Sequence, residues 1–557
     1  MTNDAIGDLV FVPLGGAGEI GMNLNLYGFG TKDDQSWVMV DLGVTFNDGT
    51  QPGVDLIMPD PTFIEKQRDN LLALVLTHAH EDHLGAVPYL WRRLKCPIYA
   101  TPFTASLLRG KLIEANLIDE VEIIVVPLQG RFQVGPFDFE LITLTHSILE
   151  PNALAIRTPV GTVLHTGDWK FDPDPVLGDA ADEDALRTLG DEGVRAIVCD
   201  STNVFMQGEA GSESDLLENL TRLIGEATGK VAIACFASNV ARLETISQAA
   251  RANGRNVLIA GKSLIRIEKA ARENGYLTDT PEFIQQEQAG YIPGNKTVII
   301  CTGSQGEPRA ALSRIASNDH PFINLGEGDT VLFSSRVIPG NETSISHLQN
   351  QLVRLGVKII TANDEFIHVS GHPARDELTH MYQLVRPEIS IPVHGELRHL
   401  REHARLAKEC QVDTAIVAEN GSVIRIGPDE AKIVDHVFSG RLTLEGKRLV
   451  PLNSEIAKSR KRAMWHGTAT ISVVVDKNGN LLSTPQLSTT GLFEDEGDPI
   501  CIEAIHKAEA AVVSQSEKNV RDDAKVKEAI RLAVRRHFRN ELGKKTVTDV
   551  HLMRVNS

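Results

Sequence analysis

Cysteine is scarce in this sequence and is never paired in a motif. The 557 residues contain six cysteines, and none of them stands in a C-x-x-C arrangement. Cys199, Cys235 and Cys301 end apolar, strand-like runs, where a small buried thiol is common. The cysteines therefore predict no disulfide framework, and a reduced, cytoplasmic compartment is the simplest interpretation.

Membrane-spanning and secretory segments are also missing. No apolar run approaches the length that crosses a bilayer. The opening stretch, M-T-N-D-A-I-G-D, contains neither the basic nor the apolar region of a signal peptide. We therefore expect no association with a membrane.

An excess of positive charge is absent as well. The net charge is −18, which argues against a protein that coats polyanions generally, although a local basic groove is compatible with it. No internal repeat or low-complexity tract is evident. A chain of this length should form several domains and bury ample core.

One glycine-rich segment matches a nucleotide-binding motif by its letters alone. Gly16 to Gly21 read G-A-G-E-I-G and follow the strand-like run L-V-F-V-P-L. A dinucleotide fingerprint opens a helix, whereas this segment leads into N-L-N-L-Y, whose alternation predicts another strand. We expect a tight turn between strands and no nucleotide cofactor. Asp41, after W-V-M-V, is either a residue that orients a metal ligand or an ordinary strand-end acid.

The densest cluster of potential metal ligands is T-H-A-H-E-D-H-L-G, residues 77–85. The apolar run before it predicts a buried strand, and His78 and His80 would point to the same side of an extended chain. A helical turn would then bring Asp82 and His83 toward the same point. Imidazole and carboxylate together favour zinc or a related cation such as manganese. Because four donors exceed the three protein ligands of an ordinary catalytic zinc, the segment predicts two metal ions.

Three further candidate ligands lie at the ends of strand-like runs. His146 ends F-E-L-I-T-L-T-H, Asp168 ends G-T-V-L-H-T-G-D, and His394 ends I-S-I-P-V-H. Each is weak alone, but open sheets gather their sites at strand ends. His165 lies inside its run, so a hydrogen-bonded neighbour is as good an interpretation as a ligand, and we leave it out.

Between about residues 205 and 365, apolar strands alternate with helical patterns. The strand-like runs are V-A-I-A-C, N-V-L-I-A, T-V-I-I-C, T-V-L-F-S and V-K-I-I-T. This alternation predicts a parallel α/β layer. The loop T-G-S-Q-G-E-P, which follows one of these runs, could offer backbone N–H groups to phosphate. F-A-S-N lies at a similar strand exit and could contact the same partner. Their alternative roles are an ordinary turn and, for Ser238 and Asn239, a helix cap.

The last part of the chain begins with a basic stretch. Residues 440–466 hold seven Lys or Arg against two acids, so they are either a solvated linker or an RNA contact. Beyond them, T-I-S-V-V-V-D-K-N-G-N-L-L predicts a strand, a turn and a second strand. Val526, Ile530, Val534 and Phe538 mark one face of a helix. We expect a small α/β module that serves self-association.

Taken together, these motifs resemble those of the metallo-β-lactamase superfamily. The matching stretches are T-H-A-H-E-D-H-L-G, T-H-S, T-G-D and P-V-H-G-E. C-D-S-T-N around Asp200, H-V-S-G-H at His368 to His372, and His394 resemble motifs A, B and C of its β-CASP branch. The order of the motifs, the length, F-A-S-N and T-G-S-Q-G-E-P are similar to the bacterial ribonuclease J family, over essentially the whole chain.

This resemblance implies an α/β fold of three domains. They are a four-layer αββα metallo-β-lactamase domain, a parallel α/β β-CASP domain inserted within it, and a small α/β C-terminal domain. We place the two parts of the first domain at residues 1–205 and 366–440, and the insertion at 206–365. A basic linker, 441–465, would lead to the C-terminal domain, 466–557.

The resemblance also assigns the metal ligands and the catalytic residues. Two Zn²⁺ per chain are implied, with Mn²⁺ as a substitute, and Glu81 remains a non-ligand. One zinc would be held by His78, His80 and His146, the other by Asp82, His83 and His394, with Asp168 bridging both. The implied catalytic residues are Asp82, Asp200 and His372.

Three segments are implied as RNA contacts. They are Phe236, Ala237 and Ser238; Gly303, Ser304 and Gln305; and His368, Val369, Ser370, Gly371 and His372.

The implied activity is hydrolysis of RNA phosphodiesters in RNA maturation and decay. It would be a 5′-to-3′ exonuclease that favours 5′-monophosphate ends, with endonuclease activity as a further possibility. Histidine at position 394 matches the form of motif C that is associated with RNA rather than DNA processing. The implied partners are single-stranded RNA, a second or further copies of the chain (a homodimer or homotetramer through the C-terminal domain), and an RNA-degradation complex. Another hydrolase of the superfamily and an RNA-binding scaffold with a vestigial metal site are the alternatives.

Overall fold

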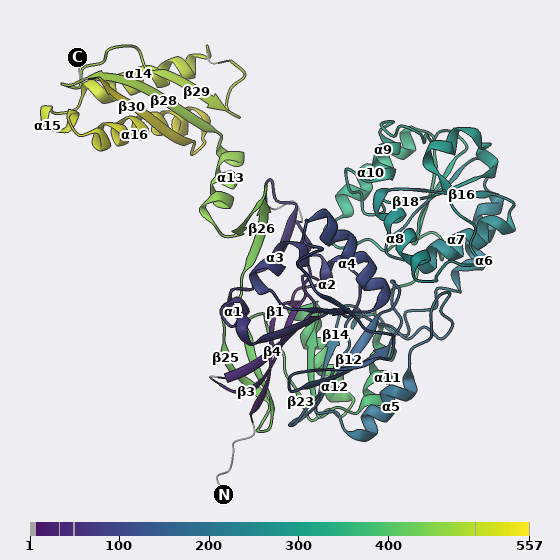
Figure 1. The fold of residues 1–557 in the computed structure, drawn as a ribbon. Coiled ribbons are helices and arrows are strands. Elements are labelled where there is room, and N and C mark those ends of the chain that lie inside the picture. Colours follow the sequence, from purple (N-terminus) through teal and green to yellow (C-terminus); the bar gives the residue numbers. More distant parts are fainter. Residues whose placement is uncertain (1–6, 33, 48–50, 496, 556–557) are drawn as a thin grey trace, which may run out of the picture. The chain divides into compact units, whose positions relative to one another are not determined.

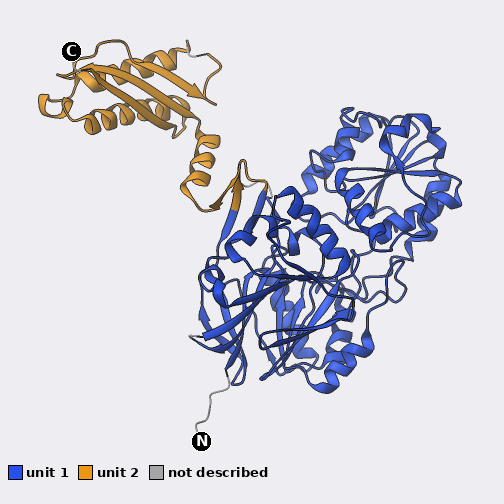
Figure 2. Cartoon of the chain, viewed as in Figure 1, with its two compact units in different colours: residues 1–48, 56–442 blue, residues 49–55, 443–557 orange. Residues whose placement is uncertain are grey.

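The computed structural model describes residues 7–32, 34–47, 51–495 and 497–555. The chain divides into two compact units, coloured separately in Figure 2. The first comprises Met1–Asp48 and Leu56–Leu442, and the second comprises Gly49–Asp55 and Thr443–Ser557.

An eight-stranded sheet forms the first layer of strands in the larger unit. Its strand order is β25-β24-β1-β3-β4-β7-β8-β9, antiparallel from β25 to β4 and parallel from β4 to β9. Its strands are β1 (Asp8–Gly15), β3 (Leu24–Thr31), β4 (Asp34–Val40), β7 (Leu71–Val75), β8 (Ile98–Ala100), β9 (Ile123–Val125), β24 (Ser422–Gly427) and β25 (Lys432–His436).

A seven-stranded sheet forms the second layer of strands. Its order is β10-β11-β12-β13-β14-β21-β23, antiparallel from β10 to β13 and parallel from there on. Its strands are β10 (Arg131–Val134), β11 (Phe137–Thr143), β12 (Asn152–Thr158), β13 (Gly161–His165), β14 (Ala196–Asp200), β21 (Ile389–Val393) and β23 (Thr414–Ala415).

One continuous apolar core lies between these two sheets. Phe11 and Val40 of the first sheet pack with Phe139, Ile156 and Val198 of the second, and all five are fully buried. Helices cover the outer faces (Figure 1), and the layers are therefore αββα, as predicted. The helices are α1 (Thr62–Glu65), α2 (Glu81–Leu84), α3 (Val87–Leu94) and α4 (Pro102–Glu114) beside the first sheet, and α5 (Glu183–Glu192), α11 (Arg375–Val385) and α12 (Leu397–Glu409) on the second. We call this part the two-sheet domain.

A second sheet system is inserted between β14 and α11, and we call it the six-stranded domain. Its strands have the order β17-β16-β18-β15-β19-β20 and are all parallel. They are β15 (Val231–Ala234), β16 (Asn256–Ala260), β17 (Ile284–Gln285), β18 (Thr297–Cys301), β19 (Thr330–Phe333) and β20 (Lys358–Thr361).

Helices lie on both faces of this parallel sheet. Figure 1 shows α9 and α10 on one side and α6, α7 and α8 on the other. The central strands are buried along their whole length, which explains why their sequences are continuously apolar rather than alternating. The parallel α/β layer expected here is confirmed. The helices are α6 (Leu216–Glu226), α7 (Val240–Ala252), α8 (Lys262–Glu273), α9 (Ala311–Ala316) and α10 (Glu342–Arg354).

The smaller unit contains a three-stranded sheet of order β29-β28-β30 with two long helices on it. Val526, Ile530, Val534 and Phe538 are buried on one face of α16, as predicted. The second strand expected directly after the N-G-N turn begins later, at Gln486, since Leu481 makes only an isolated bridge. The elements are α13 (Glu455–His466), β28 (Thr468–Asp476), β29 (Gln486–Thr490), α14 (Pro499–Val513), α15 (Glu517–Val520), α16 (Asp523–Leu542) and β30 (Val547–Val555).

The segment G-A-G-E-I-G lies between two strands and opens no helix. It follows β1 and leads into β3, as expected. Gly16, Gly18 and Gly21 have φ of +86°, +89° and +80°, a region that glycine adopts at little cost. The other short elements of the chain are β2 (Ala17–Gly18), β5 (Thr45–Phe46), β6 (Leu56–Pro59), β22 (Gly395–Glu396), β26 (Arg441–Glu445) and β27 (Arg448–Pro451), with the short helices η1 (Arg68–Asn70), η2 (Gln286–Tyr291) and η3 (Gly294–Lys296).

Cys96, Cys199, Cys235, Cys301 and Cys410 are free thiols. Among the described residues, no helix is both long enough and apolar enough to cross a membrane.

Candidate metal centre

The candidate ligands converge at the carboxyl ends of strands in both sheets of the two-sheet domain. Two groups of side chains have ligand atoms within 4.8 Å of one another, and they share Asp168. Site A consists of His78, His80, His146 and Asp168. Site B consists of Asp82, His83, Asp168 and His394.

In site A, ring nitrogens face one another. His80 Nδ1 lies 3.1 Å from His78 Nε2 and 3.1 Å from His146 Nε2. Asp168 Oδ2 lies 4.0 Å from the His78 nitrogen and 3.9 Å from the His146 nitrogen. Three nitrogens and one carboxylate oxygen therefore surround one point.

Site B has a similar spacing with two carboxylates. Asp168 Oδ2, the atom that also faces site A, lies 3.2 Å from His83 Nε2 and 3.6 Å from His394 Nε2. Asp82 Oδ2 lies 3.1 Å from His394 Nε2 and 3.7 Å from His83 Nε2. One oxygen of Asp168 is thus placed to belong to both groups.

These separations fit the coordination of zinc. Ligand atoms about 2.0–2.1 Å from a tetrahedral zinc are roughly 3.3 Å from one another, close to the 3.1 Å nitrogen spacings of site A. His78, His83, Asp168 and His394 are each at most 3% exposed. Burying this many charged or polar atoms at one point is costly unless a cation compensates. The donor set therefore fits two divalent metal ions.

Each histidine in the two sites also has a partner for its other ring nitrogen. In site B, Asp41 accepts from His83 Nδ1 at 2.7 Å, and Thr202 Oγ1 lies 2.8 Å from His394 Nδ1. Such contacts fix the tautomer and the orientation of a ligating imidazole. Asp41 therefore lies where a residue that orients a metal ligand should lie.

In site A the partners come from three different loops. Thr77 Oγ1 lies 3.0 Å from His78 Nδ1, and Ser238 Oγ lies 3.0 Å from His80 Nε2. The carbonyl of Gly371 accepts from His146 Nδ1. Ser238 belongs to the six-stranded domain, so this ring of ligands is completed from outside the two-sheet domain.

A glycine allows the loop that carries Asp82 to pack closely. A Cβ added at Gly43 would lie 1.6 Å from the carbonyl oxygen of Asp82, so no side chain fits there. Gly43 follows Asp41 in D-L-G, directly after β4. The sequence reasoning missed this residue, although its place after a strand-end acid was the available signal.

Two residues that are near the sequence motifs lie outside both sites. His165 bonds to the Tyr27 hydroxyl through its Nδ1 at 2.9 Å, in line with leaving it out of the ligand set. Glu81 pairs with Lys111, and within the described part of the chain it belongs to none of the ligand groups.

Asp200 and His372 form a pair beside the two sites. His372 Nδ1 donates to Asp200 Oδ2 at 2.7 Å and lies 3.9 Å from Asp168 Oδ2. Burial alone would lower the pKa of His372, but the charge and hydrogen bond of Asp200, together with the charge of Asp168, outweigh it and raise the pKa above its usual value. The other Asp200 oxygen accepts from the backbone and hydroxyl of Thr202. Asp168, Asp200, His372 and His394 also form a third group with ligand-like spacing.

The H-V-S-G-H segment runs from the six-stranded domain toward α11. Ser370 Oγ accepts from Asn203 Nδ2 at 2.8 Å and from the His372 backbone N–H at 3.2 Å, which leaves its own O–H free to donate. Arg336 donates to Asn203 Oδ1 at 2.7 Å. Among the described residues, His368 Nδ1 is buried without a hydrogen-bond partner.

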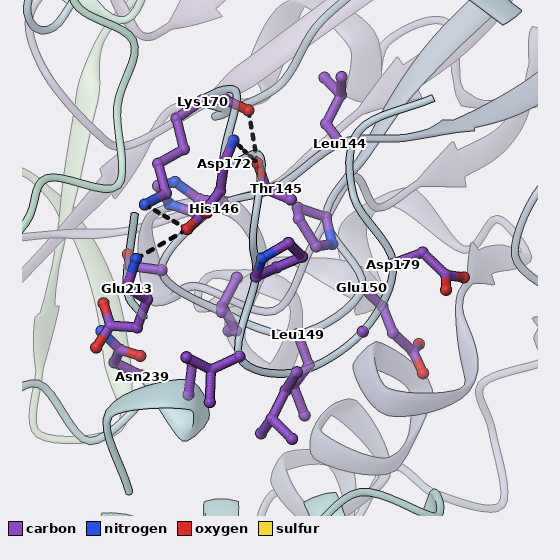
Figure 3. Close-up of a pocket in the computed structure, with 18 of the residues that line it drawn as sticks. Leu144, Thr145, His146, Leu149, Glu150, Lys170, Asp172, Asp179, Glu213 and Asn239 are labelled. Atoms are coloured by element: carbon purple, nitrogen blue, oxygen red, sulfur yellow. Dashed lines mark hydrogen bonds and ion pairs between the residues drawn. The ribbon is translucent and has the colours of Figure 1, made fainter. Parts of the chain in front are cut away.

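A cavity of about 50 Å³ lies beside this segment and reaches His146, Val369 and Ser370. Figure 3 shows Lys170, Asp172 and Glu213 on its wall, with Lys170 and Asp172 joined as an ion pair of 2.9 Å. Burial, followed by nearby Arg242, Arg336 and Lys170, lowers the pKa of His368 to about 3. Its ring is therefore neutral at pH 7.

The two loops expected to contact RNA lie at the carboxyl edge of the six-stranded sheet. Phe236, Ala237 and Ser238 follow β15, and Asn239 caps α7 by accepting from the Arg242 N–H. Gly303, Ser304 and Gln305 follow the neighbouring strand β18. The Gln305 amide bonds to Arg336 O at 2.8 Å and to the Ile338 N–H at 2.9 Å. The loop that carries Gln305 is therefore hydrogen-bonded to the loop of Arg336 and Ile338 in the same domain.

No individual sequence signal marks Thr202, Asn203 or Arg336. Thr202 and Asn203 belong to the motif C-D-S-T-N, and Arg336 belongs to no motif. Their contacts join segments 133 to 192 residues apart, which no local pattern indicates.

Family models match nearly the whole chain. They are "Metallo-beta-lactamase superfamily" at residues 29–222, "Ribonuclease J, beta-CASP domain" at 228–352, "Zn-dependent metallo-hydrolase RNA specificity domain" at 341–417, and "Ribonuclease J C-terminal domain" at 456–555.

Similar proteins are found in several bacteria. Ribonuclease J of Sinorhizobium meliloti is 43% identical over 98% of this chain and 98% of its own length. Ribonuclease J of Mycobacterium tuberculosis is 36% identical over 95% of this chain and 94% of its own. Ribonuclease J of Helicobacter pylori is 34% identical over 95% of this chain and 77% of its own.

A solved structure supports the fold alone. It is a protein of unknown function from Enterococcus faecalis V583, with a TM-score of 0.51 and 17% identity, over 75% of this chain and 100% of that one. The matched domains, their order and the full-length relatives agree with the αββα layers and the inserted parallel sheet. The chain belongs to the ribonuclease J family, metal-dependent ribonucleases of the metallo-β-lactamase superfamily.

Proposed function

We propose that this protein hydrolyses RNA phosphodiesters with two bound Zn²⁺ ions, for which Mn²⁺ can substitute. It leaves 5′-phosphate and 3′-hydroxyl ends, and it works from the 5′ end as an exonuclease, with internal cleavage as a second activity, in RNA maturation and decay. The observation that carries this proposal is the pair of ligand groups that share one oxygen of Asp168 in a chain of the ribonuclease J family.

Seven side chains would hold the metals. His78, His80 and His146 belong to one ion, Asp82, His83 and His394 to the other, and Asp168 to both. Two such ions would supply Lewis-acid chemistry: they would lower the pKa of a water molecule and stabilise negative charge on a phosphodiester oxygen.

His372 is placed to handle the proton of the leaving 3′-oxygen. Asp200 holds its Nδ1–H at 2.7 Å, which leaves Nε2 to hold or donate a proton. The raised pKa of His372, which Asp200 causes against the effect of burial, favours the protonated ring. Asp200 is itself fixed by Thr202, so the pair keeps its orientation. Asp82, as a ligand, is the third residue we assign to catalysis.

The H-V-S-G-H segment is proposed to receive the 5′-monophosphate. Ser370 retains an O–H that can donate, and His368 has a buried unpartnered nitrogen within the described structure. Arg336 is an exposed residue whose guanidinium donates to the neutral amide of Asn203. Lys170 and Arg242 are already paired with Asp172 and Glu213. Arg336 is therefore the cation that remains for the phosphate. A monophosphate seated there would place the next phosphodiester at the metals, so that each cut regenerates the same end.

Further RNA contacts are proposed for the two other loops at this edge. They comprise Phe236, Ala237 and Ser238, and Gly303, Ser304 and Gln305, with Val369 and Gly371 in the 5′-end pocket. The basic residues of α13, which is exposed over most of its length, are a further candidate.

We further propose domain boundaries for the chain: a two-sheet domain at 1–205 and 366–440, the inserted domain at 206–365, a basic linker at 441–465 and a C-terminal domain at 466–557. The C-terminal domain would join copies of the chain into a dimer or tetramer. We also propose a cytoplasmic location and membership of an RNA-degradation complex.

The test is purified protein on one single-stranded RNA labelled at either end, with and without a chelator. We expect mononucleotide release from the 5′ label first, loss of activity with chelator, and recovery on adding Zn²⁺ or Mn²⁺. Hydrolysis that is insensitive to the chelator, or that starts at the 3′ end, would refute the proposal. Binding of RNA without any turnover would favour the scaffold alternative.

A further inference from the structure

The two metal sites differ in which domain supplies the hydrogen-bond partners of their ligand histidines. In site B, His83 and His394 are held by Asp41 and Thr202, which follow β4 and β14 of the two-sheet domain. In site A, His80 is held by Ser238, which follows β15 of the six-stranded domain.

A second ligand of site A depends on the junction between the domains. His146 Nδ1 donates to the carbonyl of Gly371, which lies on the loop between β20 and α11. A Cβ added at Gly371 would lie 2.9 Å from the His146 ring and 2.6 Å from Ser147 Oγ. The backbone of this loop is therefore packed directly against the ligand.

The positions of the ring nitrogens give these contacts a chemical consequence. When a metal is bound between His78, His80 and His146, Nδ1 of His80 is a ligand, so its proton is on Nε2, where Ser238 Oγ can accept it. The same reasoning places the proton of His146 on Nδ1, facing Gly371. A ligating imidazole loses metal affinity when the partner that fixes its tautomer is removed, typically by 10–100-fold, as an order of magnitude.

The six-stranded domain is held against the two-sheet domain elsewhere by polar contacts. Asn274, directly after α8, donates to Ser106 of α4 at 2.9 Å, and Arg266 of α8 donates to Glu114 of α4 at 3.2 Å. Tyr276 donates to Glu150 at 3.1 Å. Polar contacts of this kind can break and re-form more readily than an apolar core.

We propose that the six-stranded domain controls metal occupancy of site A and leaves site B largely independent. Ser238 is a positioning residue: when the domain is seated, its hydroxyl completes the ring of partners around site A, and when it moves away, site A holds its metal less tightly. Thermodynamic linkage makes the effect reciprocal, so a metal in site A stabilises the seated domain. This inference rests on the proposed metal centre.

The first test is metal release from the full-length, zinc-loaded chain into an excess of a chromogenic chelator, followed by stopped flow. We expect two phases for the unaltered chain. Ser238→Ala should accelerate one phase by about 10–100-fold and leave the other unchanged, while Ser238→Thr, which keeps the hydroxyl, should restore the rate. Ser317→Ala removes an exposed hydroxyl of the same domain and should change nothing.

Thr202→Val supplies the complementary variant, because it removes the hydroxyl that contacts His394 of site B. It should accelerate the phase that Ser238→Ala leaves unchanged. Equal acceleration of both phases by Ser238→Ala, or no acceleration, would overturn the inference. A chain that binds no zinc would instead refute the metal centre itself and this inference with it.

Hydrogen exchange tests the reciprocal effect. Zinc should slow amide exchange in residues 236–239 of the unaltered chain, and Ser238→Ala should abolish most of that slowing. Equal zinc-induced protection of this loop in both proteins would contradict the coupling.

Discussion

Replacement of Asp41 by asparagine should weaken zinc binding without changing the shape of the site. Asp41 is fully buried and accepts three hydrogen bonds: from His83 Nδ1 at 2.7 Å, and from the backbone and hydroxyl of Thr77 at 2.8 Å each. Asparagine fills the same space, but it offers one oxygen in place of two. In either orientation its NH₂ group therefore faces an N–H of His83 or of Thr77.

The loss of zinc affinity can be estimated from this one unfavourable contact between two N–H donors. Loss of a hydrogen bond to a charged group costs about 1.5–3 kcal/mol, and loss of a partner of a ligating histidine typically lowers metal affinity by ~10–100-fold, or about 1.4–2.7 kcal/mol. The two ranges agree. If His83 escapes the clash by moving its proton to Nε2, that proton faces site B and opposes the metal. Asp41→Asn should therefore weaken zinc binding by 10–100-fold, as an order of magnitude.

The assay is zinc competition against a chelator of known affinity, with the turnover of end-labelled RNA measured on the same samples. Asp435→Asn is the control, because that carboxylate is exposed and should leave both quantities unchanged. Unaltered zinc affinity and turnover in Asp41→Asn would show that Asp41 does not orient a ligand.

Three other substitutions test separate parts of the account. His372→Ala should lower turnover by ~10²-fold or more while both metals stay bound, and an unchanged rate at saturating RNA would remove His372 from the mechanism. Ser370→Ala should reduce the preference for 5′-monophosphate over 5′-triphosphate RNA and leave internal cleavage unchanged. Equal single-turnover rates of the unaltered chain on these two RNAs would refute the proposed 5′-phosphate pocket. Glu213→Ala leaves the 1%-exposed Arg242 unpaired and should destabilise the six-stranded domain by about 3–5 kcal/mol, and an unshifted denaturation curve would contradict this.

Local patterns predicted the elements well where both faces of a strand are buried. The runs at β15, β16, β18 and β19 are short and almost continuously apolar because helices cover both sides of their sheet, and the sequence shows this directly. The prediction placed the second strand of the C-terminal hairpin too early. The alternation of apolar and polar residues does not show at which residue hydrogen bonding to β28 begins again. Proline at position 485, which has no backbone N–H, stands just before the strand that forms.

The sequence predicts those parts of the candidate site whose residues are close together in the chain. His78 to His83 lie in one loop, so their convergence follows from a strand and a turn. The contacts of Ser238 with His80 and of Gly371 with His146 join residues 158 and 225 positions apart. Those pairings are set by how the inserted domain packs, and sequence periodicity carries no information about that packing.

The zinc content of Asp168→Ala is the decisive measurement for the proposed two-metal centre, because one oxygen of Asp168 faces both sites. Metal analysis should be made on the purified, zinc-loaded full-length chain and compared with the unaltered protein, with RNA turnover measured on the same samples. We expect two zincs in the unaltered protein, one or none in the variant, and no hydrolysis by a variant that remains folded. Two zincs per chain in Asp168→Ala, together with normal turnover, would contradict the proposed two-metal centre.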